Sequence, residues 1–178
     1  RRSRGLGDVY KRQELFDETY EYIKNINSDL EDSTIKQLAN SVLTFSDLIT
    51  NRKTDYKFDL EKFTNVNGKT GIYVQYAQVR AKRLQQSVSQ QKIEIKRIVL
   101  SDVDKQLLSQ LFMFGYFLEQ SSSLNEPHHL ANYLYDISNS FNQFYEHEKL
   151  SEIKDINQLS SKLYFCLLYT SPSPRDLL

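Results

Sequence analysis

The sequence is poor in the residues that build disulfide frameworks, tight turns and membrane spans. It has one cysteine, three prolines, five glycines and no tryptophan. A lone cysteine excludes an internal disulfide, and the absence of a cysteine framework favours a cytoplasmic location. No apolar run approaches the ~18 residues that a transmembrane helix needs, so we expect no membrane span.

An excess of one charge is also missing, since Lys+Arg and Asp+Glu each number 23. Residues 14–165, without the two ends of the chain, are about four charges negative, and this mild acidity argues against unspecific polyanion binding. Any contact with RNA must therefore be local and geometric. Flat side chains are abundant, with 12 tyrosines and 10 phenylalanines. Most of them are expected in a core, and an exposed ring could stack on a base.

The two ends of the chain carry strings that one short DNA sequence explains. Residues 8–13 are DVYKRQ and residues 166–171 are CLLYTS. The strings are translations of the same DNA read from opposite strands, and that DNA resembles a transposon-end adapter used to make sequencing libraries. We therefore expect residues 1–13 and 166–178 to be adapter-like scars on a fragment, and we exclude them from functional arguments.

Apolar residues at helical spacing predict an all-α protein, a bundle of four or five amphipathic helices with short connections. The helices are expected at residues 14–27, 32–49, 70–90, 102–120 and 127–145, with a short helical turn at 59–63. Residues 93–99 are either a linker or a short strand, and a final helix begins near Ile153. The helix at 102–120 is the most apolar and is expected at the centre of the bundle.

The most informative stretch is GKTGIYVQYAQVRAKRL at residues 68–84. A turn leads into a helix on which Tyr73, Tyr76 and Arg80 share one face with Ala77. This stripe has two interpretations: a packing seam, as aromatic stripes usually are, or an RNA-binding surface with two rings, a small residue and a guanidinium. Gly68 and Gly71 can adopt positive φ before the helix without steric cost.

No catalytic constellation is visible. The chain lacks a glycine-rich phosphate loop and a Ser/His/Asp set. His128 and His129 could suggest metal or acid–base chemistry, but His147 is the only other histidine and no nearby Cys or His completes a metal set. We expect neither catalytic residues nor a metal site.

Three motifs in order resemble arginyl-tRNA synthetases. Residues 68–80 follow the pattern G-x-T-G-x-Y-x-Q-Y-A-x-x-R, found where the class I catalytic domain meets the helical DALR anticodon-binding domain. Upstream, NRKTDYKFD at residues 51–59 resembles the family's NRxxDYxFD segment. Downstream, residues 126–145 resemble its EPHxLxxYLxxLxxxFxxFY helix.

The resemblance implies a domain organisation. Residues 14–66 would be the C-terminal end of the catalytic domain, close to the tRNA stem, and residues 67–165 a truncated DALR domain. The intact protein would be an arginine-tRNA ligase, a monomer that joins L-arginine to tRNA(Arg) with ATP and Mg²⁺. The fragment itself would lack the active site and hold no cofactor.

The resemblance also implies roles for individual residues. Anticodon bases would stack on Tyr73, Tyr76 and Tyr145, with Gln75 contacting a base edge. The tRNA backbone would contact five basic residues: Arg52, Lys53, Arg80, Lys82 and Arg83. Gly68, Thr70 and Gly71 would form a hinge loop.

Two alternatives remain open from the sequence. A non-catalytic helical interaction module would bury the tyrosines in its core. The anticodon-binding end of another class I synthetase would share the helical architecture.

Overall fold

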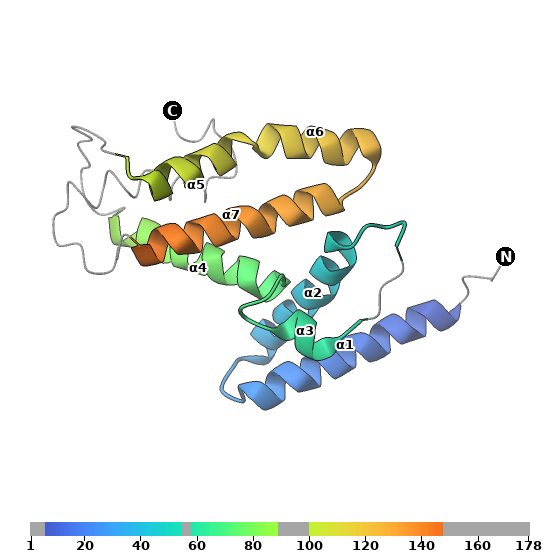
Figure 1. The fold of residues 1–178 in the computed structure, drawn as a ribbon. Coiled ribbons are helices and arrows are strands. Elements are labelled where there is room, and N and C mark those ends of the chain that lie inside the picture. The colour runs from blue at the N-terminus through green and yellow to red at the C-terminus, as the bar shows by residue number, and fades with distance from the viewer. Residues whose placement is uncertain (1–5, 55–57, 89–99, 148–178) are drawn as a thin grey trace. The chain divides into compact units, whose positions relative to one another are not determined.

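The computed structural model describes residues 6–54, 58–88 and 100–147, and every regular element in these ranges is an α-helix (Figure 1). The expected all-α class is therefore confirmed. The helices are α1 (Leu6–Ile26), α2 (Asp32–Ile49), α3 (Leu60–Thr64), α4 (Gly71–Val88), α5 (Asp102–Phe112), α6 (Phe114–Leu124) and α7 (His128–His147). Within the described ranges, none of these helices is both long and apolar enough to cross a membrane. The expected linker at 93–99 and the helix from Ile153 lie outside them.

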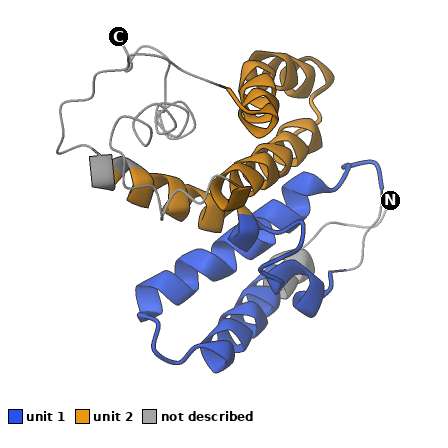
Figure 2. Cartoon of the chain, turned by 60° about the vertical axis from the view of Figure 1, so that its left-hand side comes forward, with its two compact units in different colours: residues 1–73 blue, residues 74–178 orange. Residues whose placement is uncertain are grey.

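The chain divides into two compact units, residues 1–73 and 74–178 (Figure 2). The division falls in the first turn of α4. The sequence-based domain boundary at residue 67 lies a short distance before it and remains a prediction.

In the first unit, α1 packs along α2, and α3 packs on α2. Their apolar faces share one small core, formed by Ile23, Ile35, Ala39, Val42 and Phe63. The helix expected at residues 14–27 begins earlier, at Leu6, and continues through the end assigned as a scar. The physical reason is that residues 8–13 contain neither proline nor a capping signal that would start a helix at residue 14.

The junction of α1 and α2 carries a small polar network. The Lys36 ammonium lies 2.7 Å from one carboxylate oxygen of Asp32, and the Tyr20 hydroxyl donates a hydrogen bond to the other. The bonds from Lys36 and then Tyr20 lower the pKa of Asp32, and the bond to the carboxylate raises the pKa of Tyr20. The network therefore favours the ionised carboxylate in the folded state.

We expect the Asp32 network to make stability depend on pH at the acid end. A carboxyl group with a lowered folded pKa contributes stability that is present above its unfolded value, 3.8, and is lost as the pH falls through the folded value. The urea midpoint of wild-type protein should therefore exceed that of Asp32→Asn at pH 6, and the gap should close towards pH 2. At pH 6, the urea midpoint of Tyr20→Phe, which keeps Lys36, should still exceed that of Asp32→Asn by most of the wild-type difference. A difference between wild type and Asp32→Asn that does not change with pH would contradict the assignment.

The entry into α4 is closed by local hydrogen bonds. The buried Thr70 hydroxyl donates to the carbonyl of Asn65 at 2.8 Å and accepts from the Tyr73 N–H at 3.2 Å. The second bond caps the helix. Neither Gly68 nor Gly71 uses the positive φ that glycine allows.

Gly71 is needed for a different reason, the close approach of α4 to α2 within the first unit. A Cβ at residue 71 would lie 2.6 Å from the Ser41 carbonyl oxygen and 3.0 Å from the Phe45 Cβ. Both distances are shorter than ordinary contacts, and the first involves backbone that cannot rotate away. At Gly68 the nearest atom, a methyl of Thr70, would lie at 3.4 Å.

Gly71→Ala is expected to destabilise the first unit by about 1–3 kcal/mol, the usual cost of forced overpacking. Gly68→Ala, its matched control, should change the free energy of unfolding by no more than about 1 kcal/mol, since its φ suits alanine. Urea unfolding followed by circular dichroism measures both. Equal effects at the two positions would contradict the close-approach explanation.

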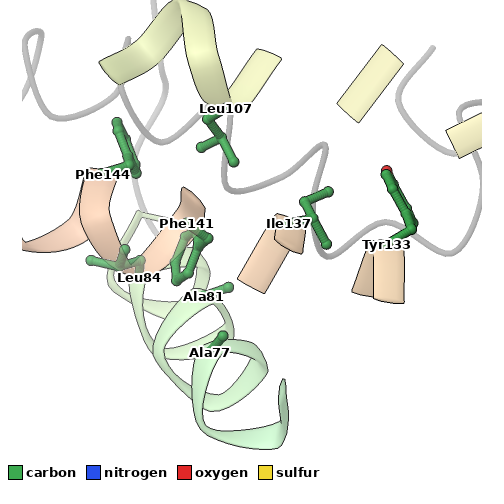
Figure 3. Packing of buried hydrophobic residues seen from close by; sticks show 8 residues of the cluster. All are labelled: Ala77, Ala81, Leu84, Leu107, Tyr133, Ile137, Phe141 and Phe144. Atoms are coloured by element: carbon green, nitrogen blue, oxygen red, sulfur yellow. The ribbon is translucent and has the colours of Figure 1, made fainter. Parts of the chain in front are cut away.

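In the second unit, α7 packs against α5 and α6. Figure 3 shows large side chains of α7 lying over small ones of α4, with Phe141 above Ala81. The core consists of eight buried residues from three helices: Ala77, Ala81, Leu84, Leu107, Tyr133, Ile137, Phe141 and Phe144. Burying one large apolar side chain of this kind contributes ~1.5–3 kcal/mol.

The helix expected at 102–120 is two helices, α5 and α6, separated at Met113. Ser101 caps α5 as expected, accepting from the Asp104 N–H in a capping box. The expected central position is wrong for the second part, because α6 has no buried residue. Phe112, the last residue of α5, is also 83% exposed. Apolar composition predicted burial along the whole segment, but Leu107 of α5 joins the buried core, whereas Phe117 of α6 is only partly buried against it.

Candidate nucleic-acid interface

Two helices of the second unit bring a cation between two aromatic rings. Tyr76 and Arg80 lie one turn apart on α4, and Tyr145 comes from the last turn of α7. The guanidinium carbon of Arg80 lies 4.3 Å from the centre of the Tyr76 ring and 4.7 Å from that of Tyr145. Both distances are within cation–π range, so one guanidinium holds two rings.

Polar groups of α7 fix the same guanidinium. Its Nη1 donates to Oδ1 of Asn142 at 3.1 Å and lies 2.9 Å from Oε1 of Glu146. Asn142 is buried, whereas the Glu146 side chain is 66% exposed and that of Arg80 19%. Arg80 is therefore anchored towards the bundle by a buried amide and towards solvent by a carboxylate.

The rings themselves are accessible. Tyr76 is 49% exposed, and Tyr145 is half-buried beside the core. The packing-seam interpretation would bury both rings. Instead, Tyr76 is exposed, and the fully buried residue is its neighbour Ala77. The apolar seam of α4 and its aromatic stripe are thus neighbouring faces of one helix. The cluster of Tyr76, Arg80, Asn142, Tyr145 and Glu146 is called the arginine–tyrosine cluster below.

The remaining basic and polar residues predicted on α4 do not all lie on this face. Arg83 is exposed and follows Arg80 by three residues, so it continues the stripe. Gln75 and Lys82 are offset around α4 from Tyr76 and Arg80 by helical spacing. The cluster therefore includes neither of them.

The other predicted site residues belong to the first unit. Tyr73 is half-buried there, at the capped start of α4. Arg52 and Lys53 are exposed in the turn that follows α2, where the Lys53 N–H donates to Asn51 at 2.9 Å. In the predicted hinge loop, Thr70 is buried and hydrogen-bonded.

Sequence reasoning missed Asn142 and Glu146. Both lie on α7 one turn apart, close to the predicted Tyr145. Their contact with Arg80 could not be predicted from local spacing, because Arg80 and Asn142 are separated by 62 positions in the sequence. The only signal was indirect: a buried-face position of α7 occupied by an amide needs a polar partner.

The structure also groups possible metal ligands that the sequence did not suggest together. Glu126, His128 and His129 each place one ligand atom within 4.8 Å of the others. The earlier expectation of no metal site considered only Cys and His partners and overlooked this carboxylate.

Arg80→Ala is expected to destabilise the protein by about 1–3 kcal/mol, because it leaves the buried Asn142 oxygen without this donor. Glu146→Gln should cost less than about 1 kcal/mol, because the carboxylate is exposed and screened by solvent. Urea denaturation compares the two. A larger loss of stability for Glu146→Gln than for Arg80→Ala would contradict the greater weight that we assign to the buried Asn142 contact.

Known proteins are similar to this chain in sequence and in fold. The DALR anticodon binding domain family matches residues 74–171, a range that begins at the first residue of the second unit and contains the arginine–tyrosine cluster. An arginine–tRNA ligase of Francisella tularensis subsp. novicida is 32% identical over 170 residues, covering 90% of this chain and 29% of the relative. That of Hyphomonas neptunium is 33% identical over 144 residues, covering 78% and 24%. The chain thus spans less than a third of these curated relatives.

Solved structures agree on the fold. The arginyl-tRNA synthetase of Thermus thermophilus matches with a TM-score of 0.70 and 22% identity, over 89% of this chain and 28% of that one. The enzyme of Plasmodium falciparum matches with a TM-score of 0.65 and 24% identity, over 94% and 31%. Because the family match covers more than half of its residues, the chain belongs to the DALR anticodon-binding domain family.

Proposed function

We propose that this chain is the anticodon-binding portion of an arginine-tRNA ligase and that it binds the anticodon of tRNA(Arg). The family membership supports binding to an anticodon, and the similarity to arginine–tRNA ligases supports the arginine specificity. The observation that carries the proposal is the arginine–tyrosine cluster, in which an exposed ring is held in a fixed orientation by a cation.

The proposed mechanism is capture of splayed bases by stacking. Anticodon nucleotides leave their stack and lie against aromatic faces, a mode that is common in the recognition of single-stranded RNA. Tyr76 offers the more exposed ring of the cluster, and the Tyr145 ring also lies within cation–π distance of Arg80. Each base–ring stack contributes ~1–3 kcal/mol. Because Arg80 already holds both rings, little ordering remains to oppose binding.

Neighbouring side chains would extend the contact. Tyr73 precedes Tyr76 by one helical turn, and Gln75 could contact a base edge. The carboxylate of Glu146, at the solvent end of the cluster, could accept from an exocyclic amine.

Basic residues would position the RNA backbone rather than specify sequence. Arg83 is the foremost candidate, because it is exposed on the stripe. Lys82 is exposed on another face, and Arg80 has only its outer edge to offer. Arg52 and Lys53 are exposed candidates in the first unit for contacts with the tRNA stem.

The proposal for the complete protein is wider. We propose that the complete protein attaches L-arginine to tRNA(Arg) with ATP and Mg²⁺, as a monomer in the cytoplasm. The described residues do not fit ATP or Mg²⁺: they include no glycine-rich phosphate loop, and the metal-ligand group found in them contains two imidazoles, whereas Mg²⁺ prefers oxygen ligands. We therefore assign the bond-making chemistry to other parts of the complete enzyme.

Tyr76→Ala is expected to weaken binding of a tRNA(Arg) anticodon stem-loop by roughly 5- to 150-fold, which corresponds to losing one stack of ~1–3 kcal/mol. Fluorescence anisotropy with a labelled stem-loop measures the dissociation constant at fixed salt. Tyr76→Phe, which keeps the flat ring, should retain most of the affinity.

The control is Tyr116→Ala. Tyr116 is a similarly exposed tyrosine of the same unit, at 52%, but lies on α6 away from the cluster. It should leave affinity unchanged, and equal losses for Tyr76→Ala and Tyr116→Ala would refute the assigned surface. A stem-loop from a tRNA of another amino acid tests whether the chain comes from an arginine-tRNA ligase or from another class I synthetase. Equal affinity for this stem-loop and for that of tRNA(Arg) would contradict the proposed arginine specificity.

A further inference from the structure

A turn at the end of α6 fixes the first member of the metal-ligand group. Asn125 has the left-handed backbone, with φ of 52°, that ends many helices. The N–H of the next residue, Glu126, then donates to the Ser121 carbonyl at 3.0 Å, and the Ser121 hydroxyl donates to the Glu126 carbonyl at 3.1 Å. The Glu126 backbone is therefore held from both sides.

The start of α7 supplies the other two members. The His129 N–H donates to the Glu126 carbonyl at 3.3 Å, and Oε2 of Glu126 lies 3.3 Å from Nε2 of His129. The two imidazole rings lie with their centres 4.2 Å apart. One ligand atom from each of Glu126, His128 and His129 lies within 4.8 Å of the others.

Burial makes this group unusual. The Glu126 side chain is only 11% exposed. The Nδ1 atom of His128 is buried and has no hydrogen-bond partner. A buried polar atom without a partner carries an uncompensated desolvation cost, so such an atom calls for an explanation.

We propose that Glu126, His128 and His129 bind a divalent transition-metal ion of the Zn²⁺ class. Two imidazoles and one carboxylate are a ligand set that Zn²⁺ accepts in tetrahedral sites, with water in the fourth position. A ligand–ligand separation of 3.3 Å, as between Glu126 and His129, suits bonds of ~2.0–2.1 Å arranged tetrahedrally. Hard, oxygen-seeking ions such as Ca²⁺ and Mg²⁺ fit two imidazoles poorly.

The proposed ion has a structural role and is independent of the RNA proposal. Its ligands come from the turn before α7 and from the first turn of α7, so a bound ion would fasten the start of that helix to the end of α6. An ion that binds the folded state preferentially stabilises it by mass action. The site would therefore raise thermal stability without taking part in bond-making.

Titration of the full chain with Co²⁺ and Zn²⁺ tests the proposal. Wild-type protein should bind one ion, seen as visible Co²⁺ absorption that excess Zn²⁺ displaces, and Zn²⁺ should raise its melting temperature. His128→Ala and His129→Ala should each weaken binding by roughly tenfold or more, since even outer-sphere changes at metal sites reach that size. His147→Ala removes the only other histidine and should bind as wild type does.

Glu126→Gln serves if an alanine variant fails to fold, because it keeps the shape and removes the anionic ligand. Circular dichroism checks the helix content of each variant before titration. Absence of Co²⁺ absorption in well-folded wild-type protein would overturn the proposal. The proposal would also be overturned if His147→Ala lost as much metal affinity as His128→Ala and His129→Ala, since the ion would then bind histidines indiscriminately.

Discussion

The second unit depends on the burial of one face of α7. Phe141 and Phe144 are completely removed from solvent, and Ile137 continues their stripe towards the start of the helix. This face packs on α5 and α6, and it meets the small side chains of α4, where Ala81 leaves room for the ring of Phe141 (Figure 3). A larger residue at that position would force the helices apart, since cores tolerate little added volume.

This packing decides where the charged groups come to lie. With the alanines of α4 turned to the core, the flank of the same helix carries Tyr76 and Arg80 next to the last turns of α7. Arg80 then meets Asn142, Tyr145 and Glu146 without any further adjustment of the chain. Apolar burial therefore positions the cation, and the cation in turn orients two rings at the surface.

The same logic explains why apolar composition alone was misleading. Residues 102–120 have the spacing of a buried helix, yet burial needs a partner face as well as a pattern. The break at Met113 divides the segment, and Leu107 of α5 reaches the core whereas α6 buries none of its residues. Gly71 offers a parallel case: its position was noticed, but the close approach that requires it involves the backbone of Ser41, thirty residues away.

Sequence by itself determined the helices and the identity of the aromatic stripe, because helical periodicity, caps such as Ser101 and the order of motifs are local properties. The helix boundaries mostly differ by a few residues from those observed, apart from the early start of α1 and the break at Met113. Only tertiary structure decided which residues join the cluster. It added Asn142 and Glu146, and it gathered Glu126 with two histidines. The reason is that helical spacing fixes which side chains share a face, whereas the partner across that face comes from a distant segment, chosen by packing.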